Sequence, residues 1–210
     1  SKDVAGDYFT PREVVRLMVS LLFAPDEDDL SDPHAIRQVY DPTCGTGGML
    51  SEAHEWLQNH GSGATLNLFG QEFNALSYAM AKADLIIKRQ DAQNIFFGDT
   101  LLKDGHQGRT FTYCLSNPPF GQEWKVQEKS VRAERERDGD DGRFAAGLPS
   151  VGDGAMLFLQ HLVSKMRPAS QGGARGAIVL NGSALFTGAA GSGPSEIRRW
   201  LLENDLVDAI

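Results

Sequence analysis

The sequence predicts an α/β fold with an open, mostly parallel, doubly wound sheet. Short apolar runs of strand length alternate with longer segments in which apolar residues recur every three or four positions, and this alternation is typical of β-α units. Several unusual motifs stand directly after predicted strands. Ligands of such sheets bind beyond the carboxyl ends of the strands, so we expect a binding site at that edge.

The chain has the length and composition of a globular domain. Its 210 residues, 41% of them hydrophobic and 23% charged, are enough to bury roughly 70% of the surface that the unfolded chain exposes. No apolar run is long enough to span a membrane, and no signal peptide is recognisable. We therefore expect no membrane association and a bacterial or archaeal cytoplasmic location.

The first predicted element is a helix over residues 11–23. Thr10 and Glu13 have the spacing of a capping box, with Pro11 at the first helical position. The apolar residues that follow recur at helical spacing, and an acidic loop comes next. We therefore treat residues 1–32 as a leading segment and residues 33–210 as the α/β core.

The core is predicted to hold six strands and four more helices. The strands are residues 38–41, 66–71, 95–97, 111–116, 176–180 and 206–210. The helices are one opened by the glycine-rich loop and ending near Gly61, one capped by Asn74 and ending near Lys88, one over residues 153–166, and one over residues 196–203 capped by Ser195. The polar stretch 122–142 is either a solvated surface loop or a mobile segment that closes on a substrate.

Both ends of the chain suggest a fragment. The sequence opens with Ser1 rather than Met and stops at the predicted strand 206–210, with nothing after it to complete the sheet. Because domains rarely leave such an edge bare, we expect a domain truncated after its sixth strand.

Neither a disulfide framework nor a metal site is predicted. The only cysteines are Cys44 and Cys114, each in an apparent functional loop or buried strand. The five histidines do not cluster with them at ligand spacing.

Residues 41–48, Asp-Pro-Thr-Cys-Gly-Thr-Gly-Gly, link the first strand to its helix. Glycines allow the backbone to approach a ligand closely, and a helix N-terminus offers N–H groups to an anionic group. The third fingerprint position is Leu50 rather than glycine or alanine, which disfavours a dinucleotide site, and the Gly-Lys-Ser/Thr of a P-loop is missing. Nucleotide-binding folds of many other kinds have such a loop.

Two carboxylates follow the next two strands. Glu72 stands where a carboxylate typically binds both ribose hydroxyls of an adenosine cofactor, and the alternative is a surface glutamate near a helix start. Asp99 is placed to accept a hydrogen bond from an adenine amino group, itself or through its backbone neighbour. The alternative for Asp99 is a helix or turn cap.

Asn117-Pro118-Pro119-Phe120 ends the fourth predicted strand. It offers two amide-type carbonyl acceptors and an aromatic face at one rigid point, which suits the binding of a flat ring that carries an amino group. Such a tetrapeptide arises by chance in roughly one chain of this length in several hundred. The alternative is a strand that ends in a proline turn.

In this order the motifs resemble those of the amino-group DNA methyltransferases that use S-adenosylmethionine, and more narrowly the modification subunit of type I restriction-modification systems. The matching segments are residues 7–12 (opening cofactor motif), 41–50 (glycine loop), 70–74 (ribose segment) and 98–101 (adenine segment), with further similarity at 143–144, 152–161 and 176–210. The resemblance covers nearly the whole chain. It implies a Rossmann-like, class I S-adenosylmethionine-dependent methyltransferase fold, without the family's N-terminal helical and C-terminal coiled-coil regions.

The resemblance also implies a cofactor site for S-adenosylmethionine. Asp7 departs from the family, because Gln or Glu is common at that position. Arg12 is placed either to contact the cofactor carboxylate or to stabilise its own helix. The implied cofactor residues are Asp7, Tyr8, Phe9, Thr10, Pro11, Arg12, Asp41, Gly45, Thr46, Gly47, Gly48, Glu72, Asp99 and Thr100.

By the same resemblance, the methyl acceptor is the amino group of an adenine flipped out of duplex DNA. The side-chain carbonyl of Asn117 and the backbone carbonyl of Pro118 would accept its hydrogen bonds, with Pro119 adding rigidity and Phe120 stacking on the ring. The implied partners are a DNA-specificity subunit, a restriction subunit and a second modification subunit. A net charge of −8 fits a chain that relies on partners for most of its DNA contacts.

The role of one other side chain and two other functions remain open. Trp124 either contacts a target strand or packs internally, whereas His161, Trp56 and Trp200 are interpreted as packing residues. The functional alternatives are methylation of a protein glutamine or an RNA base, and a cofactor-binding scaffold without activity.

Overall fold

The computed structural model describes residues 10–210, so the predicted cofactor contacts of Asp7, Tyr8 and Phe9 lie outside the described part of the chain. The chain divides into two compact units. The first extends to Asn117 and includes Lys165–Ile178, and the second comprises Pro118–Ser164 and Val179–Ile210.

The first unit contains a parallel sheet, as predicted, but with five strands instead of six. Its strands are β1 (Ile36–Asp41), β2 (Thr65–Glu72), β3 (Ile95–Phe97), β4 (Tyr113–Ser116) and β5 (Arg175–Ile178), in the order β3-β2-β1-β4-β5. The chain moves outward from β1 to β3 and then returns to place β4 beside β1. The carboxyl ends of β1 and β4 therefore flank the topological switch point, where α/β sheets bind their ligands.

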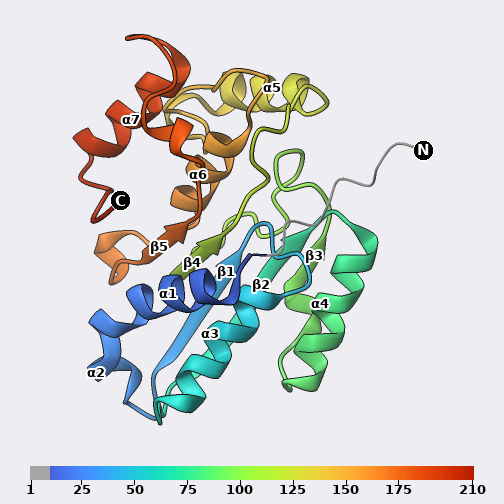
Figure 1. The fold of residues 1–210 in the computed structure, drawn as a ribbon, viewed down its shortest axis with the longest axis vertical. Helices are drawn as coiled ribbons and strands as arrows, with labels where there is room; N and C mark the ends of the chain where they lie inside the picture. The colour runs from blue at the N-terminus through green and yellow to red at the C-terminus, as the bar shows by residue number, and fades with distance from the viewer. Residues whose placement is uncertain (1–9) are drawn as a thin grey trace. The chain divides into compact units, whose positions relative to one another are not determined.

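Helices cover one face of this sheet (Figure 1). They are α1 (Arg12–Phe23), α3 (Gly48–Asn59) and α4 (Ala75–Ile87), with the short α2 (Glu27–Leu30) after α1. On this side the fully buried Phe23 meets Tyr113 edge-on, with ring centroids 4.7 Å apart. Another aromatic cluster forms around Tyr40, which stacks on Phe111 at 4.5 Å. These contacts place the apolar core on both faces of the strands.

The helix starts of the first unit agree only in part with the sequence. Asn74 caps α4 as predicted, because its side chain accepts hydrogen bonds from the backbone N–H groups of Leu76 and Ser77. The predicted capping box is wrong: the N-cap of α1 is Pro11, and no side chain caps that end. The hydroxyl of Thr10 instead accepts a hydrogen bond from the side chain of Asn117.

The second unit is helical, with α5 (Glu128–Asp138), α6 (Ala155–Ser164) and α7 (Gly193–Glu203). Met156, Ile197 and Leu201 form its buried cluster, against which the half-buried Trp200 packs. The stretch 122–142, expected to be a loop, contains α5. Val131 is its only buried residue, too little for an apolar period, and charge pairs such as Glu128–Arg132 (2.8 Å) hold its surface.

Two predictions near the end of the chain were wrong. Residues 206–210 are not a strand, and no strand among residues 10–210 pairs with them. The helix α7 begins at Gly193, with Ser192 rather than Ser195 as its N-cap. A Cβ at Gly193 would lie 1.7 Å from the Leu148 carbonyl oxygen, so this close approach requires glycine.

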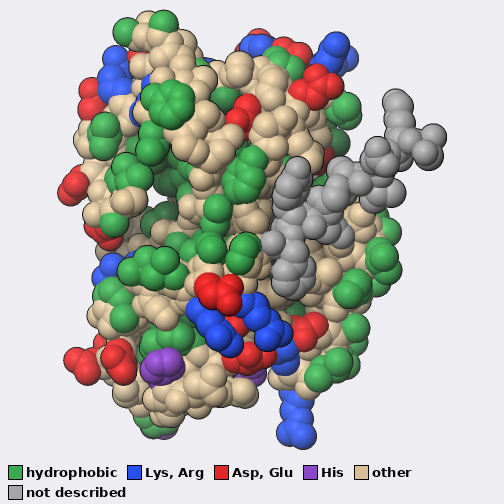
Figure 2. All heavy atoms as spheres, viewed as in Figure 1, with side chains coloured by type: hydrophobic (Ala, Val, Ile, Leu, Met, Phe, Trp, Pro, Cys, Tyr) green, Lys and Arg blue, Asp and Glu red, His purple; other side chains and the backbone are tan. Residues whose placement is uncertain are grey.

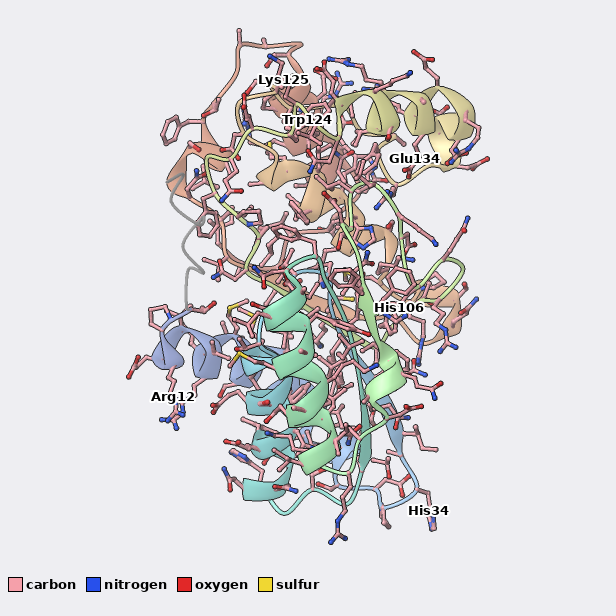
Figure 3. All side chains as sticks on the ribbon, turned by 90° about the vertical axis from the view of Figure 1, so that its right-hand side faces the viewer. Arg12, His34, His106, Trp124, Lys125 and Glu134 are labelled. Carbon is pink, nitrogen blue, oxygen red and sulfur yellow. The ribbon has the colours of Figure 1, made fainter. Side chains whose placement is uncertain are left out.

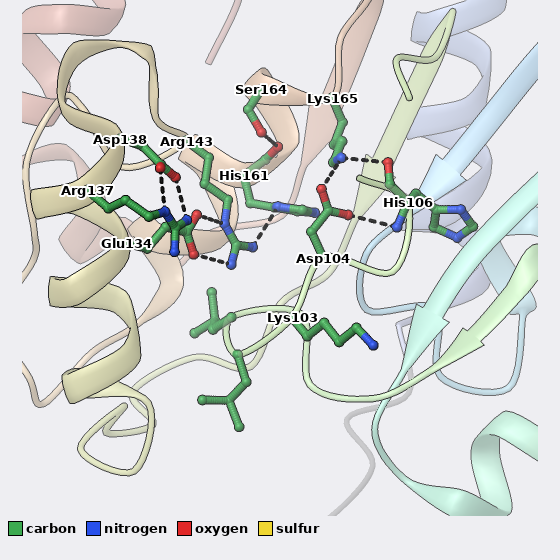
Figure 4. A network of polar contacts seen from close by, with 12 residues as sticks. Lys103, Asp104, His106, Glu134, Arg137, Asp138, Arg143, His161, Ser164 and Lys165 are labelled. Carbon is green, nitrogen blue, oxygen red and sulfur yellow. Dashed lines mark hydrogen bonds and ion pairs between the residues drawn. The ribbon is translucent and has the colours of Figure 1, made fainter. Parts of the chain in front are cut away.

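Trp124 and His161 are packing residues of the second unit. Trp124 is 2% exposed and donates its indole N–H to the Ser150 carbonyl at 2.9 Å, which leaves it no surface for a target strand. His161 is fully buried, with Nδ1 3.0 Å from a guanidinium nitrogen of Arg143, whose other nitrogens donate to Glu134 (Figure 4). Within residues 10–210, no helix is both long and apolar enough to cross a bilayer.

Candidate active site

Four loops meet at the carboxyl edge of the sheet in the first unit. Asp41 ends β1, Glu72 ends β2, Asp99 follows β3 and Asn117 follows β4. Since parallel strands all end at the same edge, the sheet brings together residues that are far apart in the sequence.

Asp41 shapes the glycine loop from inside. It is 2% exposed, and its Oδ1 accepts hydrogen bonds from the backbone N–H (2.9 Å) and the hydroxyl (3.3 Å) of Thr43. The Thr43 hydroxyl also lies 3.0 Å from that of Ser116, the last residue of β4. Asp41 thus supports the loop instead of presenting its carboxylate to solvent.

The glycine loop borders open space. Gly45 and Gly47 have φ angles of +54° and +89°, a left-handed conformation that favours glycine. A Cβ added at Gly45 or at Gly48 would meet nothing within 4 Å. A ligand therefore has room beside this backbone, at the start of α3.

Glu72 is a structural bridge as well as a candidate ligand contact. It is 7% exposed, and its two carboxylate oxygens accept from the backbone N–H of Gly45 (2.9 Å) and of Asn74 (2.7 Å). This excludes the alternative of a surface glutamate. Glu72 therefore holds the β1 loop against the start of α4.

The loop after β3 is tied to the loop after β1. Asp99 caps a turn, since its Oδ1 accepts from the backbone N–H of Leu101 (2.8 Å) and of Leu102 (3.3 Å), as in the alternative interpretation. Thr100 is 4% exposed and donates its hydroxyl to the Pro42 carbonyl at 2.6 Å. Thr100 therefore holds two loops together, a role that its position in the sequence did not suggest.

Gln71 is a site residue that sequence reasoning missed. Its fully buried side chain donates to the carbonyls of Gly98 (3.1 Å) and Lys103 (2.8 Å) and accepts from the N–H of Gly105 (3.0 Å). It therefore clamps the whole loop that carries Asp99. The available signal was a polar residue directly before Glu72, after the run Leu68-Phe69-Gly70.

A buried charge network holds the other end of that loop. Figure 4 shows Lys165 between Asp104 and His106. The Lys165 ammonium group forms an ion pair with Asp104 and donates a hydrogen bond to the backbone carbonyl of His106 at 2.9 Å. The ring of His106 lies with Nε2 3.0 Å from the Gly70 carbonyl. Lys165 and Asp104 are both largely buried, so this network fixes the loop firmly to β2.

Asn117 has one satisfied and one unsatisfied end. Its side-chain N–H₂ donates to the hydroxyl of Thr10 at 2.6 Å. Its side-chain oxygen is buried and has no hydrogen-bond partner among the described residues. Buried acceptors in native proteins are nearly always paired, so this oxygen marks a position at which a ligand donor would be stabilised.

The remaining predicted residues are less informative. Pro11 and Arg12 are exposed, and the Arg12 side chain points away from the helices (Figure 3). Thr46 is half-buried in the glycine loop. Pro118, Pro119 and Phe120 follow Asn117 directly and belong to the second unit, where Pro118 is buried.

Burial controls the titration of the site. It raises the pKa of Asp41 to about 7, with the neighbouring Glu72 charge adding to the effect. Burial also raises the pKa of the Cys44 and Cys114 thiols well above their ordinary value, so neither is a thiolate nucleophile near neutral pH. Over residues 10–210, no three His, Cys, Asp or Glu side chains are grouped to hold a metal ion.

We predict that Asp41→Asn becomes progressively more stable than the wild type as pH rises from about 4 to 7. Folding raises the pKa of Asp41 from 3.8 to about 7, so its contribution to stability is present below pH 4 and is lost as the buried carboxyl ionises. With about 1.4 kcal/mol per pKa unit, the difference is on the order of 4 kcal/mol. Urea unfolding of both proteins across this pH range measures the difference in their free energies of unfolding. A difference that does not change with pH would contradict the prediction.

Gln71→Leu is expected to lower the free energy of unfolding by about 2–4 kcal/mol, because three buried backbone groups lose their partner. It is also expected to weaken cofactor binding through movement of the loop around Asp99. The matched control is Gln93→Leu at an exposed position. Denaturant unfolding and calorimetric titration with S-adenosylmethionine measure the two effects, and a Gln71→Leu protein as stable as the control would exclude the clamp.

Comparison with known proteins gives a consistent family. A family model described as N-6 DNA Methylase matches residues 1–210. The type I restriction enzyme MjaIX methylase subunit of Methanocaldococcus jannaschii is 29% identical over 209 residues, which cover 99% of this chain and 34% of that protein. The HindI methylase subunit of Haemophilus influenzae is 27% identical over 209 residues, 98% of this chain and 42% of that protein.

Comparison with solved structures agrees with this family. The type I restriction-modification system methyltransferase subunit from Streptococcus thermophilus has a TM-score of 0.76 and 28% identity, covering 98% of this chain and 41% of that one. A class I S-adenosylmethionine-dependent methyltransferase from Listeria monocytogenes shares the fold at 15% identity, with a TM-score of 0.67, over 96% of this chain and 54% of that one. This chain spans about a third to two fifths of the length of the two methylase subunits compared above. With its parallel sheet and the complete set of motifs at the strand ends, it has the class I methyltransferase fold and belongs to the N-6 DNA methylase family.

Proposed function

We propose that this chain is the catalytic domain of an adenine-specific DNA methyltransferase, the modification subunit of a type I restriction-modification system. It would transfer a methyl group from S-adenosylmethionine to the exocyclic amino group of adenine in duplex DNA. The observation that carries the proposal is the buried, unpartnered side-chain oxygen of Asn117 at the switch point of the sheet. An amino group is the donor that this acceptor lacks.

The residues at the strand ends fit the proposed cofactor. Glu72 and the open glycine loop at Gly45 and Gly48 would hold its ribose and the adjacent chain, and the turn at Asp99 would border its adenine. When bound, S-adenosylmethionine supplies an electrophilic methyl group. The protein contributes the positions of the acceptors and the exclusion of water, and positioning of this kind provides much of the rate enhancement in two-substrate reactions.

Asn117 would act on the amino group by hydrogen bonding alone. An aromatic amino nitrogen is a poor nucleophile because its lone pair is delocalised into the ring. Acceptors at the Asn117 side chain and the Pro118 carbonyl would favour a pyramidal nitrogen with its lone pair directed at the methyl donor. Transfer would form the N–C bond as the S–CH₃ bond breaks, and the proton released from the amino group would pass to solvent. An amide cannot take up that proton, so Asn117 acts as an acceptor of hydrogen bonds and not as a general base.

The surface charge supports dependence on partners for DNA binding. The face drawn in Figure 2 shows acidic and basic side chains intermingled instead of a continuous basic field, and the net charge is −8. Affinity for DNA comes largely from Lys and Arg contacts to phosphates. We therefore propose that a specificity subunit makes most of the contacts to DNA, and that a restriction subunit and a second modification subunit complete the assembly.

The alternatives are less well supported. Methylation of a protein glutamine or an RNA base would use the same polar acceptor, but the family match favours DNA. An inactive scaffold would have no reason to keep a buried acceptor unpaired, since this costs about 1–3 kcal/mol.

Asn117→Ala in the full-length protein, assayed with its partner subunits, is expected to lower the single-turnover rate of methyl transfer to duplex DNA by about 100- to 1000-fold. Binding of S-adenosylmethionine should change less than about threefold, because the lost oxygen acts on the methyl acceptor. Transfer is measured with labelled cofactor and binding by calorimetry.

The exposed Asn59, at the end of α3, provides the control Asn59→Ala, which should retain wild-type transfer. Unchanged transfer by Asn117→Ala would overturn the proposed role of this residue.

A further inference from the structure

The side chain of Asn117 is hydrogen-bonded to a residue far from it in the sequence. Thr10 accepts the side-chain N–H₂ of Asn117 at 2.6 Å, although 107 positions separate the two in the sequence. The opposite end of the same amide is the buried, unpartnered oxygen. The two observations concern the two ends of one planar group, so the hydrogen bond to Thr10 anchors the amide in the arrangement that leaves its oxygen for a ligand.

This matters because an asparagine amide has two chemically opposite ends. The torsion that turns it is broad and roughly two-fold, so the side chain alone selects poorly between them. With the oxygen presented, the site accepts hydrogen bonds from an amino group. With the nitrogen presented, it would offer N–H groups to a substrate that also offers N–H groups, and binding would fail.

The backbone next to Thr10 and its side chain are both conformationally restricted. It precedes Pro11, whose ring restricts the backbone and whose carbonyl accepts from the N–H groups of Val14 and Val15 in the first turn of α1. A β-branched threonine also has few side-chain rotamers. The Thr10 hydroxyl does not cap α1 and is hydrogen-bonded to Asn117 instead.

We propose that Thr10 is a positioning residue that acts through Asn117, holding its amide with the oxygen directed at the methyl acceptor. This inference rests on the proposed function and differs from the prediction that Thr10 contacts the cofactor. A cofactor contact would change the affinity for S-adenosylmethionine, whereas a positioning residue changes the rate of transfer. The two roles therefore have separate experimental signatures.

The test uses Thr10→Val, which keeps the shape of the side chain and removes the hydroxyl, in the full-length protein with its partner subunits. Its single-turnover rate of methyl transfer to duplex DNA should fall about 10- to 100-fold, while its Kd for S-adenosylmethionine stays within about twofold. Thr10→Ser restores a hydroxyl and should recover the rate to within about threefold. Thr65→Val, at the exposed start of β2, is the matched control.

A double-substitution cycle separates this role from a general structural one. In an Asn117→Ala background, Thr10→Val should cause no further loss of rate, because the group on which it acts is gone. Rates are normalised to the fraction of protein that binds S-adenosylmethionine, so partial unfolding does not imitate the effect.

Three results would overturn the inference: a normal rate in Thr10→Val, a raised Kd for the cofactor at unchanged rate, or equal losses of rate in the two backgrounds. Failure of the unsubstituted protein to methylate DNA would instead contradict the proposed function, and the two failures are therefore distinguishable.

Discussion

The site depends on hydrogen bonds that join separate loops at the carboxyl edge of a parallel sheet. Glu72 accepts from the backbone on both sides, at Gly45 and Asn74, so one carboxylate fixes the loop of β1 against the helix that follows β2. Thr100 and Gln71 add the loop after β3. With these bonds in place, the open space beside the glycine loop is preorganised before any ligand binds, which lowers the entropic cost of binding.

Within this fixed frame, one polar atom is left unsatisfied. The Asn117 oxygen is held in place by the bond from the other end of its amide to Thr10, and the surrounding burial makes a ligand donor more valuable there than in water. Asp41 differs from Asn117, because its side-chain oxygen already accepts a hydrogen bond from Thr43 and burial raises its pKa to about 7. The contrast separates a group that supports the loop from one that awaits a substrate.

The sequence predicted the features that depend on local patterns. The order of strands and helices, the cap at Asn74 and the position of Glu72 after a strand follow from periodicity and from neighbouring residues. The bonds from Gln71 to residues 98–105 and from Thr10 to Asn117 arise only when distant segments meet, and no local pattern encodes them. The helix α5 was missed because its sequence has no apolar period, with Val131 its only buried residue. Residues 206–210 have strand-like composition, but no strand within residues 10–210 pairs with them.

The most direct measurement of the central claim is the identity of the methylated product. The full-length protein with its partner subunits would be incubated with duplex DNA and isotopically labelled S-adenosylmethionine, and the nucleosides and proteins would then be separated by mass spectrometry. The account predicts label in N6-methyladenine, absent when S-adenosylmethionine is omitted. Label in cytosine, in RNA or in a protein glutamine, with none in adenine, would contradict it.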